Sequence, residues 1–101
     1  MGFDLDFVEV RQGKIIAFTD IKQNHDKITW IEKQCYPQLE EIAPVLIIEI
    51  NKELSEYKIY NYKNEENSLT FNKRDFYNDF LPNIETYINN VFKFNWIRFA
   101  S

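Results

Sequence analysis

The sequence predicts an α/β domain in which a mixed four-stranded sheet carries helices on both faces. Short runs rich in branched and aromatic residues alternate with a longer run of helical spacing. The apolar run at 44–51 has no polar side, which is typical of a strand covered on both faces. The 101 residues are 45% apolar with only two glycines, so we expect one domain, 1–101, with a packed core.

Two strands open the chain. The runs 4–11 and 14–22 flank Gln12 and Gly13, a glycine-containing pair typical of a hairpin turn. Residues 23–27 are polar and are expected to form a loop.

Residues 28–43 predict the first helix. Apolar side chains recur along this run at helical spacing, at Ile31, Cys35, Leu39 and Ile42. Thr29 and Glu32 have the spacing of a capping box. Pro37 lacks a backbone donor, so we expect a kink there or a helix that restarts at it.

The second half of the chain predicts two more strands and a helical end. Residues 44–51 form the third strand, 55–63 an alternating edge strand, and the polar residues after it a loop. Asn72 can cap a helix that contains Phe76 and Phe80, and Pro82 should end or restart that helix. The predicted order is therefore β-β-α-β-β, followed by one or two helices.

The register of the first hairpin decides whether its polar side chains meet. With a two-residue turn, Asp6 lies on the face opposite to Asp20. With a three-residue loop, or with one bulge near Gly13, Asp6 faces Asp20 and Asp4 faces Lys22. This second register places on the face of Asp6 the apolar side chains Val8, Val10, Ile16 and Phe18.

Two opposed carboxylates repel each other unless a cation or a proton lies between them. Mg²⁺ binds through one or two carboxylates and keeps positions for water and phosphate. In the second register Asp6 and Asp20 would supply the carboxylates and the backbone carbonyl of Ile21 a further oxygen. Lys22 would orient the attacking water or stabilise charge on a phosphate, which suits phosphodiester hydrolysis.

The stretch DLDFVEVRQGKIIAFTDIK resembles the core of the PD-(D/E)xK nuclease superfamily, the restriction-endonuclease-like fold that includes Holliday junction resolvases. The resemblance covers residues 4 to about 51, with Asp6, Asp20 and Lys22 matching the motif. It implies a Mg²⁺- or Mn²⁺-dependent endonuclease that acts on DNA. The glutamine that some members carry on the next helix is matched by Gln34, with Gln38 one turn later. The nuclease-like core would span about 4–63 and a C-terminal helical segment about 70–101.

Other interpretations of the same residues stay open. Asp20 and Lys22 also fit a strand end in water with a screened ion pair. Asp4 and His25 also fit solvated surface positions, and Gln34 a residue at the helix boundary. The chain would then be a non-catalytic module of the nuclease fold, or an unrelated small α/β interaction protein, that binds nucleic acid or a protein.

Charge and composition narrow the function further. A net charge of −4 argues against broad electrostatic adhesion to nucleic acid, so contact with DNA should be local or metal-assisted. The single cysteine allows no internal disulfide and no zinc spacing, which favours a reducing, cytoplasmic compartment. No apolar run approaches the ~20 residues that span a bilayer, so we expect a soluble protein without membrane contact. The apolar tail at 94–99 should pack on the domain or form a homodimer contact.

Overall fold

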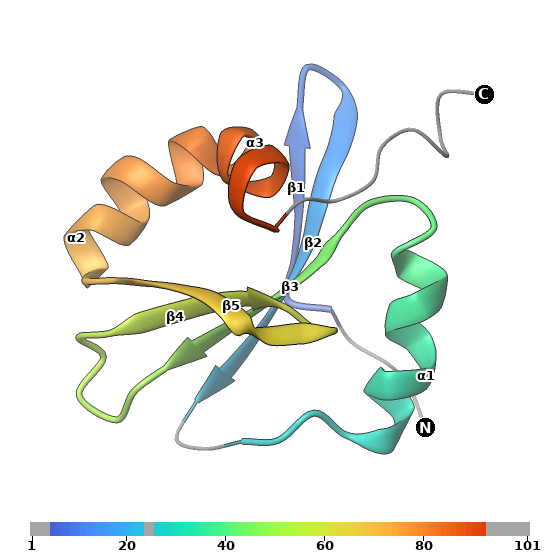
Figure 1. Cartoon of the computed structure of the whole chain (residues 1–101), viewed down its shortest axis with the longest axis horizontal. Helices are drawn as coiled ribbons and strands as arrows, with labels where there is room; N and C mark the ends of the chain where they lie inside the picture. The colour runs from blue at the N-terminus through green and yellow to red at the C-terminus, as the bar shows by residue number, and fades with distance from the viewer. Residues whose placement is uncertain (1–4, 24–25, 93–101) are drawn as a thin grey trace.

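Five strands form one mixed sheet in the computed structural model, which describes residues 5–23 and 26–92 (Figure 1). Along the sheet they follow chain order: β1 (Phe7–Arg11), β2 (Lys14–Gln23), β3 (Val45–Ile50), β4 (Tyr57–Asn61) and β5 (Asn64–Phe71). β2 and β3 are parallel, and every other neighbouring pair is antiparallel. The predicted α/β class and mixed sheet are confirmed at this level.

The fifth strand corrects the predicted four-stranded sheet and the predicted loop after residue 63. Tyr62 and Lys63 make a two-residue turn, since Asn61 pairs with Asn64. The first half of β5 is polar and exposed, so its sequence gives no apolar alternation to read. A strand at a sheet edge needs no buried side chains on both faces, and polar residues are common there.

β4 is consequently an interior strand rather than the expected edge strand. Tyr57, Ile59 and Tyr60 are buried, and β4 pairs with β3 on one side and β5 on the other. On the β5 side, Lys58 Nζ lies 2.9 Å from Glu65 Oε2 and supports the cross-strand pairing.

Helix α1 (Trp30–Leu39) begins at the predicted capping box. The Thr29 hydroxyl accepts a hydrogen bond from the Glu32 amide at 3.2 Å, and Glu32 Oε1 accepts one from the Thr29 amide at 2.8 Å. The helix runs through Pro37 and ends two residues later, short of the predicted residue 43. Pro37 has no N–H to donate to the carbonyl of residue 33, so the helix lacks one backbone bond and continues for only two residues beyond the proline.

The buried face of α1 differs from the predicted apolar stripe. Tyr36 is the buried helix residue, whereas Ile42 lies after the helix end and is 54% exposed. Glu40, also buried, accepts hydrogen bonds from the Val45 amide at 3.2 Å and pairs with Lys63 Nζ at 2.6 Å. Polar contacts therefore fix the end of α1 to β3 and to the β4–β5 turn.

The C-terminal helical layer runs from residue 73 to 92 in five consecutive turns: α2 (Lys73–Asp75), η1 (Phe76–Phe80), η2 (Leu81–Asn83), α3 (Ile84–Tyr87) and η3 (Ile88–Phe92). Asn72 caps its start as predicted, with Oδ1 accepting from the Asp75 amide at 2.7 Å. Pro82 falls in the short turn η2, after which the helix resumes, as predicted for a restart.

Two hydrophobic clusters lie on opposite faces of the sheet (Figure 1). The helical layer covers one, whose largest members include Leu46, Ile59, Phe80 and Ile84. Helix α1 covers the other, with Phe18, Tyr36 and Ile47. Across residues 5–23 and 26–92, no helix has the length and apolar character to cross a membrane. Asp4, His25 and the apolar tail at 94–99 lie outside the described residues.

Phe80→Ala should lower the free energy of unfolding by about 3–5 kcal/mol, because a fully buried ring is removed. Phe80 contacts the rings of Phe71, Phe76 and Tyr87. Chemical denaturation measures the loss. The control Tyr77→Ala removes a ring that is 52% exposed and should cost about 1 kcal/mol or less. Equal losses for the two variants would contradict the described packing.

Candidate functional site

The β1–β2 hairpin combines a tight turn with a bulge. Gln12 and Gly13 form a two-residue turn with φ values of 54° and 75°, the left-handed geometry that such hairpins require. Val10 pairs with Ile15, but Glu9 pairs with Ala17. The residue between them, 16, is therefore an extra residue in β2, a β-bulge that shifts the register by one.

This shift gives the register in which Asp6 faces Asp20. Phe7 pairs with Thr19, so the next position places Asp6 beside Asp20. Asp6 Oδ2 accepts a hydrogen bond from the Ile21 amide at 2.7 Å, which fixes its carboxylate against β2. The alternative register, with Asp6 on the opposite face, is wrong.

The position of the bulge differs from the simplest form of that prediction. The extra residue lies within β2 rather than in the turn, so Arg11 still pairs with Lys14. Ile15 packs against the cluster of Phe18 and α1, whereas Ile16 belongs to the cluster under the helical layer. The expectation that Ile16 shares the face of Asp6 is therefore wrong, because side chains change face at the bulge.

Asp20 is a buried carboxylate near the end of β2. Its side chain is 4% exposed, and the Tyr36 hydroxyl donates a hydrogen bond to Oδ2. The pKa of Asp20 is raised to about 7, chiefly by burial and then by the neighbouring Asp6 and Glu32, while Tyr36 and Lys22 lower it in part.

Lys22 projects from β2 on the same face as Asp20 and is held by α1. Its Nζ lies 2.7 and 2.6 Å from the two carboxylate oxygens of Glu32 and 3.8 Å from Asp20 Oδ2. Burial alone would raise the pKa of Glu32, but the hydrogen bonds from Lys22 and the Thr29 amide lower it overall. Glu32 is thus an ionised partner for Lys22 and the cap of α1 at once.

Three carboxylates and one ammonium group therefore meet between β2 and α1: Asp6, Asp20, Glu32 and Lys22. The resulting formal charge is negative, and only Lys22 offsets it inside the cluster. A further cation, or a proton on Asp20, would relieve the repulsion.

Gln34, the predicted glutamine of the site, has an exposed side chain on α1, and its backbone carbonyl accepts from Gln38 Nε2 at 3.3 Å. The helix residue that contacts Lys22 is Glu32, two positions earlier. Ile21 contributes its amide to Asp6; the ligand role of its carbonyl stays a prediction.

Sequence reasoning missed Glu32 and Tyr36 as members of the cluster. They are four residues apart, so they lie on the same side of a helix. The capping-box pattern assigned Glu32 to the helix start and gave no indication that Glu32 contacts Lys22. Tyr36 lay outside the stripe of smaller apolar residues, and its hydroxyl group reaches Asp20 only through the packing of α1 on the sheet.

In the part of the chain that the structure describes, no group of three or more histidine, cysteine, aspartate or glutamate side chains is arranged to hold a metal ion. Comparison with family models, with curated proteins and with solved structures finds no match.

Asp20→Asn should make the protein less sensitive to pH. The folded pKa of Asp20 is raised from 3.8 to about 7, so folding retains a proton that the unfolded chain releases in this window. The stabilisation that comes from this retained proton is complete below the pKa of Asp20 in the unfolded chain. It is lost as the pH rises through the pKa of Asp20 in the folded protein, by up to about 1 kcal/mol per pH unit. Urea denaturation of both proteins across this window should show the variant gaining relative stability as pH rises. Parallel profiles would contradict the burial of this carboxyl.

Proposed function

We propose that the protein is a small metal-dependent nuclease of the PD-(D/E)xK type that hydrolyses phosphodiester bonds in DNA. The observation that carries the proposal is the bulged hairpin, which sets Asp6 beside Asp20 and Lys22. The order of hairpin, helix and a third strand parallel to β2 supports the same assignment.

The chemistry of the cluster fits a divalent cation. Two carboxylates, Asp6 and Asp20, are enough for Mg²⁺ or Mn²⁺, which take their other oxygens from water and phosphate. The raised pKa of Asp20 reflects burial beside other carboxylates, and a cation would favour its ionised form. When bound, the ion would polarise a scissile phosphate and acidify its water.

The protein's own residues have separate roles in this proposal. Asp6 and Asp20 hold the ion, with the Ile21 carbonyl as a further oxygen. Lys22, once released from Glu32, orients the attacking water or stabilises charge on the phosphate. Tyr36 fixes the orientation of the Asp20 carboxylate.

A non-catalytic module of the same fold is the second candidate function. The observation that favours it is the close pairing of Lys22 with both oxygens of Glu32, which neutralises the ammonium group. The protein would then bind nucleic acid or a protein partner without cleaving it. A cleavage assay separates the two functions.

In a cleavage assay, Asp6→Asn, Asp20→Asn and Lys22→Met should each lower the rate on DNA by at least about 100-fold, because each removes a group that acts in the transition state. The assay uses purified protein with supercoiled, linear and branched DNA plus Mg²⁺ or Mn²⁺. Glu41→Gln, an exposed acid after α1, is the matched control and should cleave like the wild type. Cleavage that persists in Asp20→Asn, or no cleavage of any of these DNAs, excludes the enzymatic role.

Mn²⁺ should raise the melting temperature of the wild type, because a ligand that binds only the folded state at about 100 times its Kd adds about 2.7 kcal/mol. The rise should be larger above the pKa of Asp20 than below it, since the proton competes with the metal. Differential scanning fluorimetry with and without Mn²⁺ measures it. Asp20→Asn should lose the rise and Glu41→Gln should keep it; a rise of equal size in all three proteins would place the metal elsewhere.

A further inference from the structure

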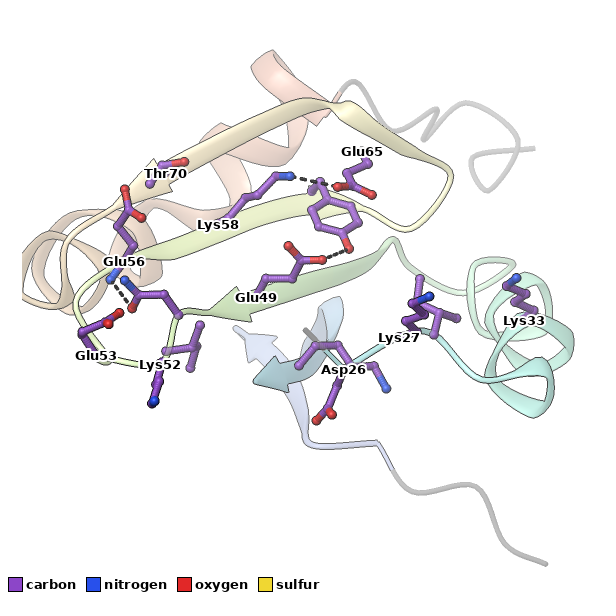
Figure 2. A pocket seen from close by; sticks show the side chains of 15 residues that line it. Asp26, Lys27, Lys33, Glu49, Lys52, Glu53, Glu56, Lys58, Glu65 and Thr70 are labelled. Atoms are coloured by element: carbon purple, nitrogen blue, oxygen red, sulfur yellow. Dashed lines mark hydrogen bonds and ion pairs between the residues drawn. The ribbon is translucent and has the colours of Figure 1, made fainter. Parts of the chain in front are cut away.

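A groove of about 930 Å³, with many charged residues in its lining, opens beside the candidate site (Figure 2). Lys22 belongs both to the carboxylate cluster and to the lining of this groove. The floor comes from β3, β4 and β5, beyond the area that α1 covers. Anything bound in the groove would therefore meet the candidate site at Lys22.

The charges of the groove floor are largely paired. Lys58 Nζ contacts Glu65 Oε2 at 2.9 Å, and the Tyr60 hydroxyl donates to Glu49 Oε1 at 2.7 Å. Figure 2 shows both interactions across the strands. Lys58 and Glu65 cancel in charge, whereas Glu49 accepts from a neutral phenol and keeps its charge, so the floor adds one negative charge to those of the two walls.

The two walls carry opposite charge. Lys27 and Lys33 stand on the α1 side, both exposed and neither in an ion pair with any described residue, and Asp26 next to Lys27 reduces the net charge of this wall to one positive charge. The loop between β3 and β4 forms the other wall, with Glu53 and Glu56 against the single Lys52. Figure 2 shows these two groups on opposite sides of the groove. One wall would attract a phosphate backbone and the other would repel one.

Trp30 lies beside the basic wall, outside the lining of the groove. It is the first residue of α1, is 65% exposed, and is three residues away from both Lys27 and Lys33. Residues three apart on a helix are neighbours on its surface, so Trp30 adjoins Lys33, whereas Lys27 precedes the helix. An exposed indole ring beside a lysine is a combination that binds unpaired bases and their phosphates.

We infer that the groove binds a single strand of DNA, with its phosphates at Lys27 and Lys33, and leads it to Lys22. A duplex is disfavoured because its second backbone would lie against Glu53 and Glu56. This inference rests on the proposed nuclease function, since it names the form of DNA that the site receives.

The test is binding without cleavage, by fluorescence anisotropy of the full chain in EDTA. The probes are a labelled oligothymidine and a blunt duplex of the same length, titrated over a salt series. The single strand should bind at least about tenfold more tightly than the duplex. Lys27→Ala with Lys33→Ala should flatten the slope of log K against log salt by about 1.4, the value for two lost phosphate contacts on a single strand.

Three further variants provide a control lysine and test the roles of Trp30 and of the acidic wall. Lys73→Ala removes an exposed lysine from α2, on the other face of the sheet, and should leave the slope unchanged. Trp30→Ala should weaken single-strand binding about tenfold. Glu53→Gln with Glu56→Gln should improve duplex binding. The four substituted groove residues and Trp30 are exposed, so melting temperatures should stay near that of the wild type.

Equal or tighter binding of the duplex overturns the inference, as does a salt slope that the double lysine variant leaves unchanged. The proposed function fails separately, in the cleavage assay with Asp20→Asn. Single-strand binding that depends on Lys27 and Lys33, in a protein that cleaves no DNA, would retain the groove and exclude the nuclease. Cleavage that is lost in Asp20→Asn, together with single-strand binding that is unchanged in the double lysine variant, would retain the nuclease and exclude the groove as the binding site.

Discussion

One extra residue in β2 determines which side chains of the hairpin meet. Without the bulge at residue 16, the tight turn at Gln12 and Gly13 would place Asp6 on the face opposite to Asp20. With it, Ile16 and Ala17 face the helical layer while Phe18 and Asp20 face α1. The bulge therefore decides which side chains of β1 share a face with the end of β2, and so brings Asp6 to the side of Asp20. Both the packing of the sheet and the composition of the candidate site follow from it.

The contacts within the polar cluster affect the ionisation of Tyr36, Glu32 and Asp20 in different ways. Tyr36 has its pKa raised by burial and by its bond to Asp20, so it remains a phenol that can donate. Glu32 stays ionised because Lys22 contacts both of its oxygens. The environment of Asp20 is less favourable to its charged form than that of Glu32, since burial and nearby carboxylates both raise the pKa of Asp20. Buried, charge-rich arrangements of this kind cost stability and are concentrated at functional sites.

Local patterns predicted much of the fold, and long-range packing decided the rest. The hairpin, the capping box at Thr29, the buried strand β3 and the cap at Asn72 were all readable, because each depends on residues close in sequence. β5 was missed because its exposed half carries no apolar period. The pairing of Asp6 with Asp20 could be reduced to two registers but not chosen, since a bulge at Ile16 leaves no compositional mark. Glu32 could not be assigned to the site from spacing alone, because its contact with Lys22 depends on how α1 docks on the sheet.

Glu32 links the first turn of α1 to the ionic state of the cluster. Its Oε1 accepts from both Lys22 Nζ and the Thr29 amide, so a rotation of the Glu32 side chain that frees the lysine also breaks this capping bond. Loss of a helix cap costs about 1 kcal/mol and loosens the first turn, where Trp30 lies. Release of Lys22 and fraying of this helix end are thus one conformational event with a shared energetic cost. The barrier to exposing the lysine is set partly by the backbone of α1.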